Sequence, residues 1–102
     1  MRDPYHPRLE DVELANVLHA LSDPVRLEIV RVLAAVEEVP CNSLHTALSK
    51  STMSHHFKVL REAGVTHTRT SGTKRLISLR RNELEGRFPG LLSSILHASK
   101  AA

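Results

Sequence analysis

The sequence of 102 residues predicts one mainly α-helical domain with a small β-hairpin, spanning 1–102. Three observations predict this class. Apolar residues recur at helical spacing before Gly64; a stretch rich in Thr, Val and Ile around Ser-Gly-Thr-Lys follows it; and a Leu-rich segment after Pro89 returns to helical spacing. Only three residues are aromatic and none is Trp, so the core is expected to be aliphatic.

The first two helices are indicated by apolar stripes. The first stripe is Leu14, Val17, Leu18 and Leu21, at i, i+3, i+4 and i+7. The second is Val25, Ile29, Val30 and Leu33. Ser22 or Asp23 is expected to cap the second helix, with Pro24 in its first turn, and Pro40 to exclude helix just before it. Before these helices, the polar segment 1–10 is expected to be a flexible arm.

A short third helix is expected within 42–50, and a fourth over 51–63. Ser51 is the expected N-cap of the fourth helix, and Gly64 occupies the position of a left-handed C-terminal residue. Met53, Phe57 and Leu60 recur at i, i+4 and i+7, so they form its inner face. Polar side chains occupy its outer face.

Segment 65–80 is expected to form a hairpin with a Gly-containing turn, and 89–99 a terminal helix. Four helices, a hairpin and a terminal helix in this order are typical of a winged helix-turn-helix. The short third helix and the fourth helix form the helix-turn-helix, in which the fourth helix recognises DNA, and the hairpin is the wing.

Charge is segregated along the chain. Residues 1–49 contain four Lys or Arg against eight Asp or Glu, whereas residues 50–81 contain eight against one. The basic third therefore coincides with the expected recognition helix and wing, as a nucleic-acid surface requires. No apolar run approaches the roughly 18 residues of a membrane span, so no membrane partner is expected.

The stretches "ALSDPVRLEIVRVL", "SLHTALSKSTMSHHFKVLREAGV" and "RTSGTKRLISL" together resemble the ArsR/SmtB family of bacterial winged-helix repressors. The resemblance covers roughly Leu14 to Leu79. It implies a homodimer built through the first and last helices, a near-palindromic double-stranded DNA operator, and release from DNA when an inducer binds. It also implies a cytoplasmic regulator without enzymatic activity or a cofactor.

The resemblance assigns DNA contacts to Lys50, Ser51, Ser54 and His55 on the recognition helix. The helical period adds Thr52 and Lys58 to the same face. Arg69, Lys74 and Arg75 are the expected wing contacts. The expected dimer interface consists of Leu14, Val17, Leu18, Leu91, Leu92, Ile95 and Leu96. The alternative for these apolar residues is a place in the intrachain core.

The adjacent His55 and His56 are a poor metal pair. Neighbouring helix residues point about 100° apart, whereas metal-binding histidines on a helix are normally four residues apart. His55 is expected to face DNA, and His56 to lie at the helix edge, against the third helix or a phosphate.

Cys41 and His45 have the i, i+4 spacing that could place two sensing ligands on one face. A zinc site needs three or four ligands. The family's thiol sites use a Cys-x-Cys pair, and here Cys41 falls between the two ligand positions. A thiolate at a helix start is the redox alternative.

The sequence therefore predicts a sequence-specific DNA-binding repressor, released by an inducer that is not a metal. Two alternatives stay open: a redox- or metal-responsive repressor that uses Cys41, and a winged-helix module that binds protein. A Gly-rich phosphate loop, a His-Glu-x-x-His motif and a nucleophile elbow are absent from the sequence, which disfavours an enzyme.

Overall fold

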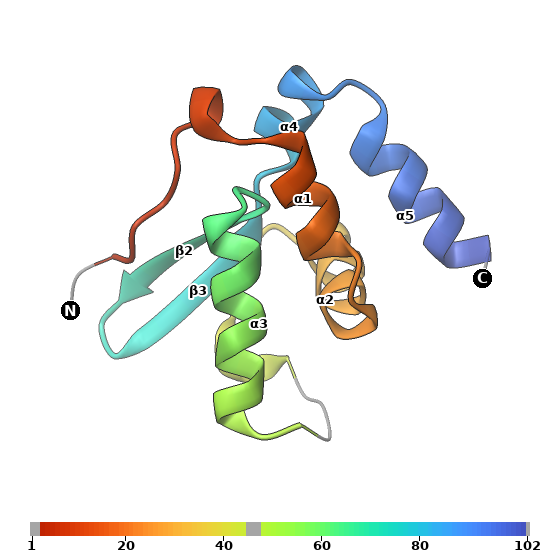
Figure 1. Cartoon of the computed structure of the whole chain (residues 1–102). Helices are drawn as coiled ribbons and strands as arrows, with labels where there is room; N and C mark the ends of the chain where they lie inside the picture. Colours follow the sequence, from red (N-terminus) through yellow and green to blue (C-terminus); the bar gives the residue numbers. More distant parts are fainter. Residues whose placement is uncertain (1–2, 45–47, 102) are drawn as a thin grey trace.

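The computed structural model describes residues 3–44 and 48–101, with side chains as far as residue 99. The helices are α1 (Leu14–Leu21), α2 (Pro24–Ala34), α3 (Lys50–Glu62), α4 (Arg81–Arg87) and α5 (Leu91–Ala101). The strands are β1 (Val39–Pro40), β2 (Thr66–Ser71) and β3 (Lys74–Leu79), and the 3-10 helices are η1 (Leu9–Asp11) and η2 (Cys41–Ser43). Figure 1 shows the hairpin and α5 at opposite sides of the molecule, with α1, α2 and α3 between them. This is the predicted winged helix-turn-helix architecture.

The expected recognition helix, wing and terminal helix have counterparts in α3, the β2–β3 hairpin and α5, with ends shifted by one or two residues. In place of the third helix expected within 42–50, the structure has only the 3-10 turn Cys41–Ser43. Leu44, Leu48 and Ser49 are not helical, so the prediction was wrong for the described residues; residues 45–47 lie outside them.

Asp23 is the N-cap of α2, which settles the choice between Ser22 and Asp23. Its Oδ1 accepts hydrogen bonds from the backbone N–H groups of Val25 (2.8 Å) and Arg26 (3.1 Å), and Pro24 begins the helix. The N–H of Arg26 is the larger cause that lowers the pKa of the Asp23 carboxyl.

The core is aliphatic, as the composition predicts. Its most buried side chains include Val17, Val30, Leu33, Leu60 and Ile77. These residues come from α1, α2, α3 and β3, so a single core holds the three helices against the sheet.

Gly64 ends α3 in the left-handed region, at φ +86°. The N–H of Val65 donates to the carbonyl of Leu60 and that of Gly64 to the carbonyl of Arg61, each at 3.0 Å, which closes the helix end. A Cβ at residue 64 would also overlap the side chain of buried Val12. Glycine is therefore required here by backbone conformation and by space.

The sheet is antiparallel, in the order β1-β3-β2. Ser71 pairs with Lys74 across the two-residue turn that contains Gly72, whose φ is +63°. β1 was not predicted. Val39 pairs with Ile77 and Pro40 with Leu76, and proline is tolerated there because β1 is an edge strand.

Residues 3–8 lie along the outer edge of β2 (Figure 1). The N–H of Thr68 donates to Nε2 of His6 (2.9 Å), and the N–H of Thr70 donates to Oδ1 of Asp3 (2.6 Å). The His6 ring also stacks on His67, with centroids 4.3 Å apart. The segment expected to be a flexible arm therefore has specific contacts that cover an open strand edge.

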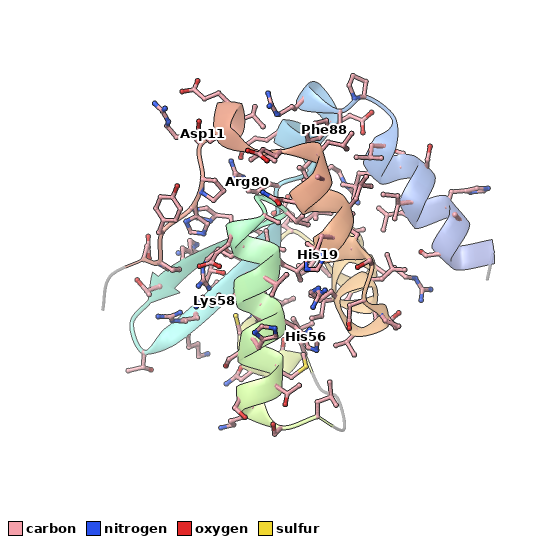
Figure 2. All side chains as sticks on the ribbon, viewed as in Figure 1. Asp11, His19, His56, Lys58, Arg80 and Phe88 are labelled. Atoms are coloured by element: carbon pink, nitrogen blue, oxygen red, sulfur yellow. The ribbon has the colours of Figure 1, made fainter. Side chains whose placement is uncertain are left out.

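Arg80 joins this arm to the rest of the fold (Figure 2). One Nη donates to the carbonyl of Pro7 (2.9 Å), while the other Nη and Nε contact the carboxylate of Glu83 (2.7 and 3.2 Å). These hydrogen bonds lower the pKa of the Glu83 carboxyl. Arg80 itself is buried, so its charge is paired with Glu83 as burial demands.

Arg26 on α2 contacts both α1 and α3, and so fixes the position of α3, the expected recognition helix. The side chain is 7% exposed, and its Nε donates to the carbonyl of Ala20 (2.7 Å) at the end of α1. One Nη lies 3.4 Å from the carbonyl of His19, and the other lies 3.2 Å from Nδ1 of His56 on α3. Because a guanidinium can only donate, Nδ1 of His56 must be the acceptor.

The described part of the chain contains no helix that is both long and apolar enough to cross a membrane.

Replacing Arg26 with Ala is expected to lower the free energy of unfolding by about 3 kcal/mol. The change leaves the carbonyl of Ala20 and Nδ1 of His56 without their donor. Urea denaturation followed by circular dichroism measures the loss. Arg31→Ala is the matched control on the same helix, because Arg31 pairs with Glu28 at the surface (2.6 Å) and should cost less than about 1 kcal/mol. Equal losses in the two variants would contradict the role of Arg26.

Acidification is expected to release the arm at His6. Burial is the first cause that lowers the pKa of His6 from 6.5, with the nearby charges of His67, Arg61 and Arg80 acting in the same direction and Asp3 opposing them. A histidine whose folded pKa is depressed contributes stability above its unfolded pKa and loses it as the pH falls through the folded value. Protonation of Nε2 also removes the acceptor for the N–H of Thr68.

Amide hydrogen exchange at Thr68 should therefore accelerate as the pH falls below about 6.5, beyond the intrinsic pH dependence of exchange. His6→Asn keeps a neutral acceptor and should flatten this response. A response that persists in the variant would assign it to His67 instead.

Candidate nucleic-acid interface

The N-terminus of α3 carries a cluster of hydroxyl groups. Its N-cap is Ser49, whose Oγ accepts the N–H of Thr52 (3.2 Å), so the expectation that Ser51 is the cap was wrong. Ser51 lies one residue inside the first turn, and both its hydroxyl (3.1 Å) and that of Thr52 (2.9 Å) contact Ser49 Oγ. Exposed N–H groups and hydroxyls at a helix N-terminus favour an anion such as a phosphate.

One face of α3 is polar and open. The residues that the sequence assigned to DNA contact on this helix are all exposed: Lys50, Ser51, Thr52, Ser54, His55 and Lys58. Lys50 and Lys58 form no ion pair with any carboxylate of the described residues. The face therefore offers cations and hydroxyls together, which is what phosphates and base edges accept.

The two adjacent histidines have different surroundings. His55 is exposed, whereas His56 is 8% exposed and accepts a hydrogen bond from Arg26. The contact that fixes His56 is therefore the one with Arg26 of α2, whereas a contact with the third helix or a phosphate was expected. The described residues contain no group of three or more His, Cys, Asp or Glu side chains that could hold a metal.

The three expected wing cations are not equivalent. Nε and Nη2 of Arg69 each donate to a carboxylate oxygen of Glu38 at 2.8 Å. These bonds lower the pKa of the Glu38 carboxyl and raise that of Arg69. Lys74 and Arg75 lie beside the turn and are exposed, with no ion pair among the described residues. The available positive charge of the wing therefore lies on Lys74 and Arg75.

Cys41 does not have the environment of a reactive thiolate. The residue is partly buried and packs against the core, and this burial raises the pKa of its thiol. The nearby charges of Arg75 and Arg61 oppose the rise but do not reverse it. The redox alternative for Cys41, which needs a lowered thiol pKa at the helix start, is therefore not favoured by this environment. His45, the other expected sensing residue, lies outside the described residues.

The expected dimer residues divide into two groups. Val17 and Leu92 are 1% and 3% exposed in the single chain, so they belong to the intrachain core and not to a surface. Leu14 and Leu18 are each 45% exposed on α1. Leu91, Ile95 and Leu96 are partly buried on α5. The surface available to a partner therefore consists of these last five residues.

Sequence reasoning missed Arg26 and Ser49. Arg26, Ile29, Val30 and Leu33 have the i, i+3, i+4, i+7 spacing of a buried face, and all four are buried. This spacing is the available signal for Arg26, but a stripe defined by apolar residues does not include it, because arginine is rarely buried. Ser49 had no distinct signal, because Ser49 and Ser51 are equally good caps by residue type.

Comparison with known proteins agrees with this geometry. A family model described as a helix-turn-helix domain matches residues 21–69. The uncharacterized HTH-type transcriptional regulator YceK of Bacillus subtilis is 37% identical over 89 residues, which are 84% of this chain and 89% of YceK. An arsenical resistance operon repressor of Staphylococcus xylosus is 39% identical over 74 residues, which are 72% of this chain and 71% of that repressor.

A solved structure supports the same relationship. The transcriptional repressor BigR from Xylella fastidiosa is 31% identical, with a TM-score of 0.59, and the match covers 74% of this chain and 85% of BigR. The extent of these matches, together with the fold and the exposed face of α3, shows that the chain belongs to the ArsR family of winged helix-turn-helix transcriptional regulators.

Proposed function

We propose that this regulator is a sequence-specific repressor that leaves its operator when an inducer other than a metal ion binds. The observation that carries the DNA-binding part is the exposed face of α3, which offers hydroxyl groups together with lysines that form no ion pair among the described residues, beside the exposed Lys74 and Arg75 of the wing. The relatives from Staphylococcus xylosus and Xylella fastidiosa are named repressors, which favours repression over activation.

The regulator acts in the cytoplasm as a homodimer, with no enzymatic activity. The exposed leucines of α1 (Leu14 and Leu18) and the partly buried apolar side chains of α5 (Leu91, Ile95 and Leu96) form the dimer surface. A twofold dimer presents two copies of α3, so the operator is near-palindromic, with half-sites spaced by a helical turn or more.

A metal inducer is disfavoured on two grounds. The described residues offer no cluster of three or more metal ligands, and Cys41, the expected sensing residue among them, is partly buried and packs against the core. Zinc sites need three or four ligands, of which thiolates must be deprotonated.

The first experiment is fluorescence anisotropy of the full chain with the DNA upstream of its own gene, beside a scrambled duplex, over a salt series. We expect tighter binding to the upstream DNA and an affinity that falls with salt. Weak binding to both duplexes would favour the second candidate, a winged-helix module whose target is a protein.

Lys58→Ala is expected to weaken binding to every DNA sequence and to reduce the slope of log affinity against log salt by about 0.9 for each lost phosphate contact. The matched control is Arg8→Ala, because Arg8 is an exposed cation already paired with Glu10 (3.0 Å) and Asp11 (3.2 Å). An unchanged slope for Lys58→Ala would contradict its assignment to a phosphate.

Ser54→Ala and His55→Ala are expected to reduce discrimination between operator and scrambled DNA, by about 1–3 kcal/mol where a base contact is lost. Both side chains are exposed on α3, so their removal should leave the melting temperature unchanged. Equal losses on both duplexes would show that these residues position the helix and do not read bases.

A further inference from the structure

A cavity of about 420 Å³ lies between α3, the hairpin and the turn at Cys41. Its size falls in the range of small-molecule sites, which is roughly 300–1,000 Å³. One wall is a stripe of α3 at i, i+4, i+7 and i+11, made by Lys50, Ser54, Phe57 and Arg61. Thr68 and Arg75 of the hairpin form the opposite wall.

The middle of this cavity is apolar and its ends are cationic. Phe57 and Met53 of α3, with Leu44 from the turn, supply apolar surface. Lys50 and Arg61 lie eleven residues apart, at the two ends of the stripe. A ligand that fits this arrangement has an apolar body and a negative charge.

Two polar groups at the cavity have no hydrogen-bond partner among the described residues. Thr68 is 2% exposed, and its Oγ1 makes no hydrogen bond, although its backbone N–H is bound by His6. Nε of Arg61 is also buried without a partner. Buried polar groups are usually paired, so each such group indicates a missing acceptor or donor.

The positive charge of the cavity is not neutralised by the protein. No Asp or Glu lines it. Within the described residues, neither Arg61 nor Arg75 forms an ion pair. Both guanidiniums also lie near Cys41: burial raises the pKa of its thiol, and the charges of Arg75 and Arg61 oppose that rise. Two free guanidiniums that act on one residue make a local site for an anion.

DNA binding alone does not explain all of these groups. Lys50, Ser54 and Arg75 are exposed and belong to the proposed DNA interface. Thr68 and Nε of Arg61, in contrast, are buried beside apolar side chains and do not belong to the exposed face that the proposed DNA interface uses. The inner part of the cavity is therefore suited to an occupant smaller than a duplex.

We propose that this cavity binds a small organic anion with an apolar body, of the aromatic carboxylate class, and that this ligand is the inducer. Its carboxylate pairs with Arg61 and Arg75, and its body contacts Phe57 and Met53. The ligand and DNA compete because Lys50, Ser54 and Arg75 serve both. The inducer role rests on the proposed function, whereas the binding site does not.

Ligand binding is tested first without DNA. The full chain, labelled with ¹⁵N, is titrated with benzoate and phenylacetate, and with benzamide as the neutral isostere. We expect the carboxylates to shift the amide resonances of Phe57 and Thr68, with saturation at a ligand concentration of about 1 mM. The affinity for benzamide should be at least about tenfold weaker. Shifts spread over the whole surface, or equal shifts with benzamide, would overturn the site.

Three variants sharpen this test. Arg61→Gln and Arg75→Gln should each weaken carboxylate binding at least tenfold. Arg75 is exposed on the hairpin, so R75Q keeps the test decisive if R61Q does not fold. Arg31→Gln is the control, because its Nε is also buried without a partner but Arg31 lies outside this cavity. Weakening by R31Q as large as by R75Q would overturn the proposal.

The inducer role is tested by adding the same three probes to the complex with upstream DNA. The carboxylates should release DNA from the wild-type chain at the concentration that saturates the resonance shifts, and R61Q should resist this release. Saturable binding without release would overturn the inducer role. If the chain binds no DNA, the proposed function fails while the resonance shifts still decide the ligand site.

Discussion

The position of α3, the proposed recognition helix, depends on the hydrogen bonds of the buried Arg26 guanidinium. It binds the carbonyls of Ala20 and His19 in the last turn of α1 and the imidazole of His56 on α3, so one side chain joins three helices. Carbonyls at a helix C-terminus favour a cation, which offsets part of the cost of burying the charge. Asp23 adds a second constraint, because its Oδ1 accepts the N–H groups of Val25 and Arg26 and so fixes the start of the helix that carries Arg26.

This arrangement explains why two neighbouring histidines in one helix have unrelated roles. His56 follows the period of Met53 and Leu60, so its side chain belongs to the buried face, where Arg26 supplies its partner. His55 lies about 100° further round and is exposed with Lys58. The inner histidine fixes the helix, and the outer one is left available for DNA.

Periodicity and turn chemistry predicted the helices α1, α2, α3 and α5, the hairpin and the exposed face of α3, because each depends on local spacing. What the sequence did not predict depends on distant partners. β1 is two residues long and exists only through its pairing with β3. The arm is ordered by β2, more than sixty residues away, and Arg69 is paired with Glu38. Arg26 is buried because its partners are a carbonyl of the preceding helix and an imidazole thirty residues later. The helical period gives the position of Arg26 on the buried face but does not identify these partners.

The sheet is the point at which these distant contacts meet the DNA-binding face. Thr68 has its backbone N–H bound by His6 on the outer edge, while its side chain lines the cavity against α3. One residue along β2, Arg69 is paired with Glu38 and therefore leaves less positive charge at the wing for DNA. Lys50, Arg61 and Arg75, which form no ion pair among the described residues, line the space between helix and wing. Because the same strip of α3 borders both this space and the proposed DNA surface, an anion that occupies one reduces the charge available to the other.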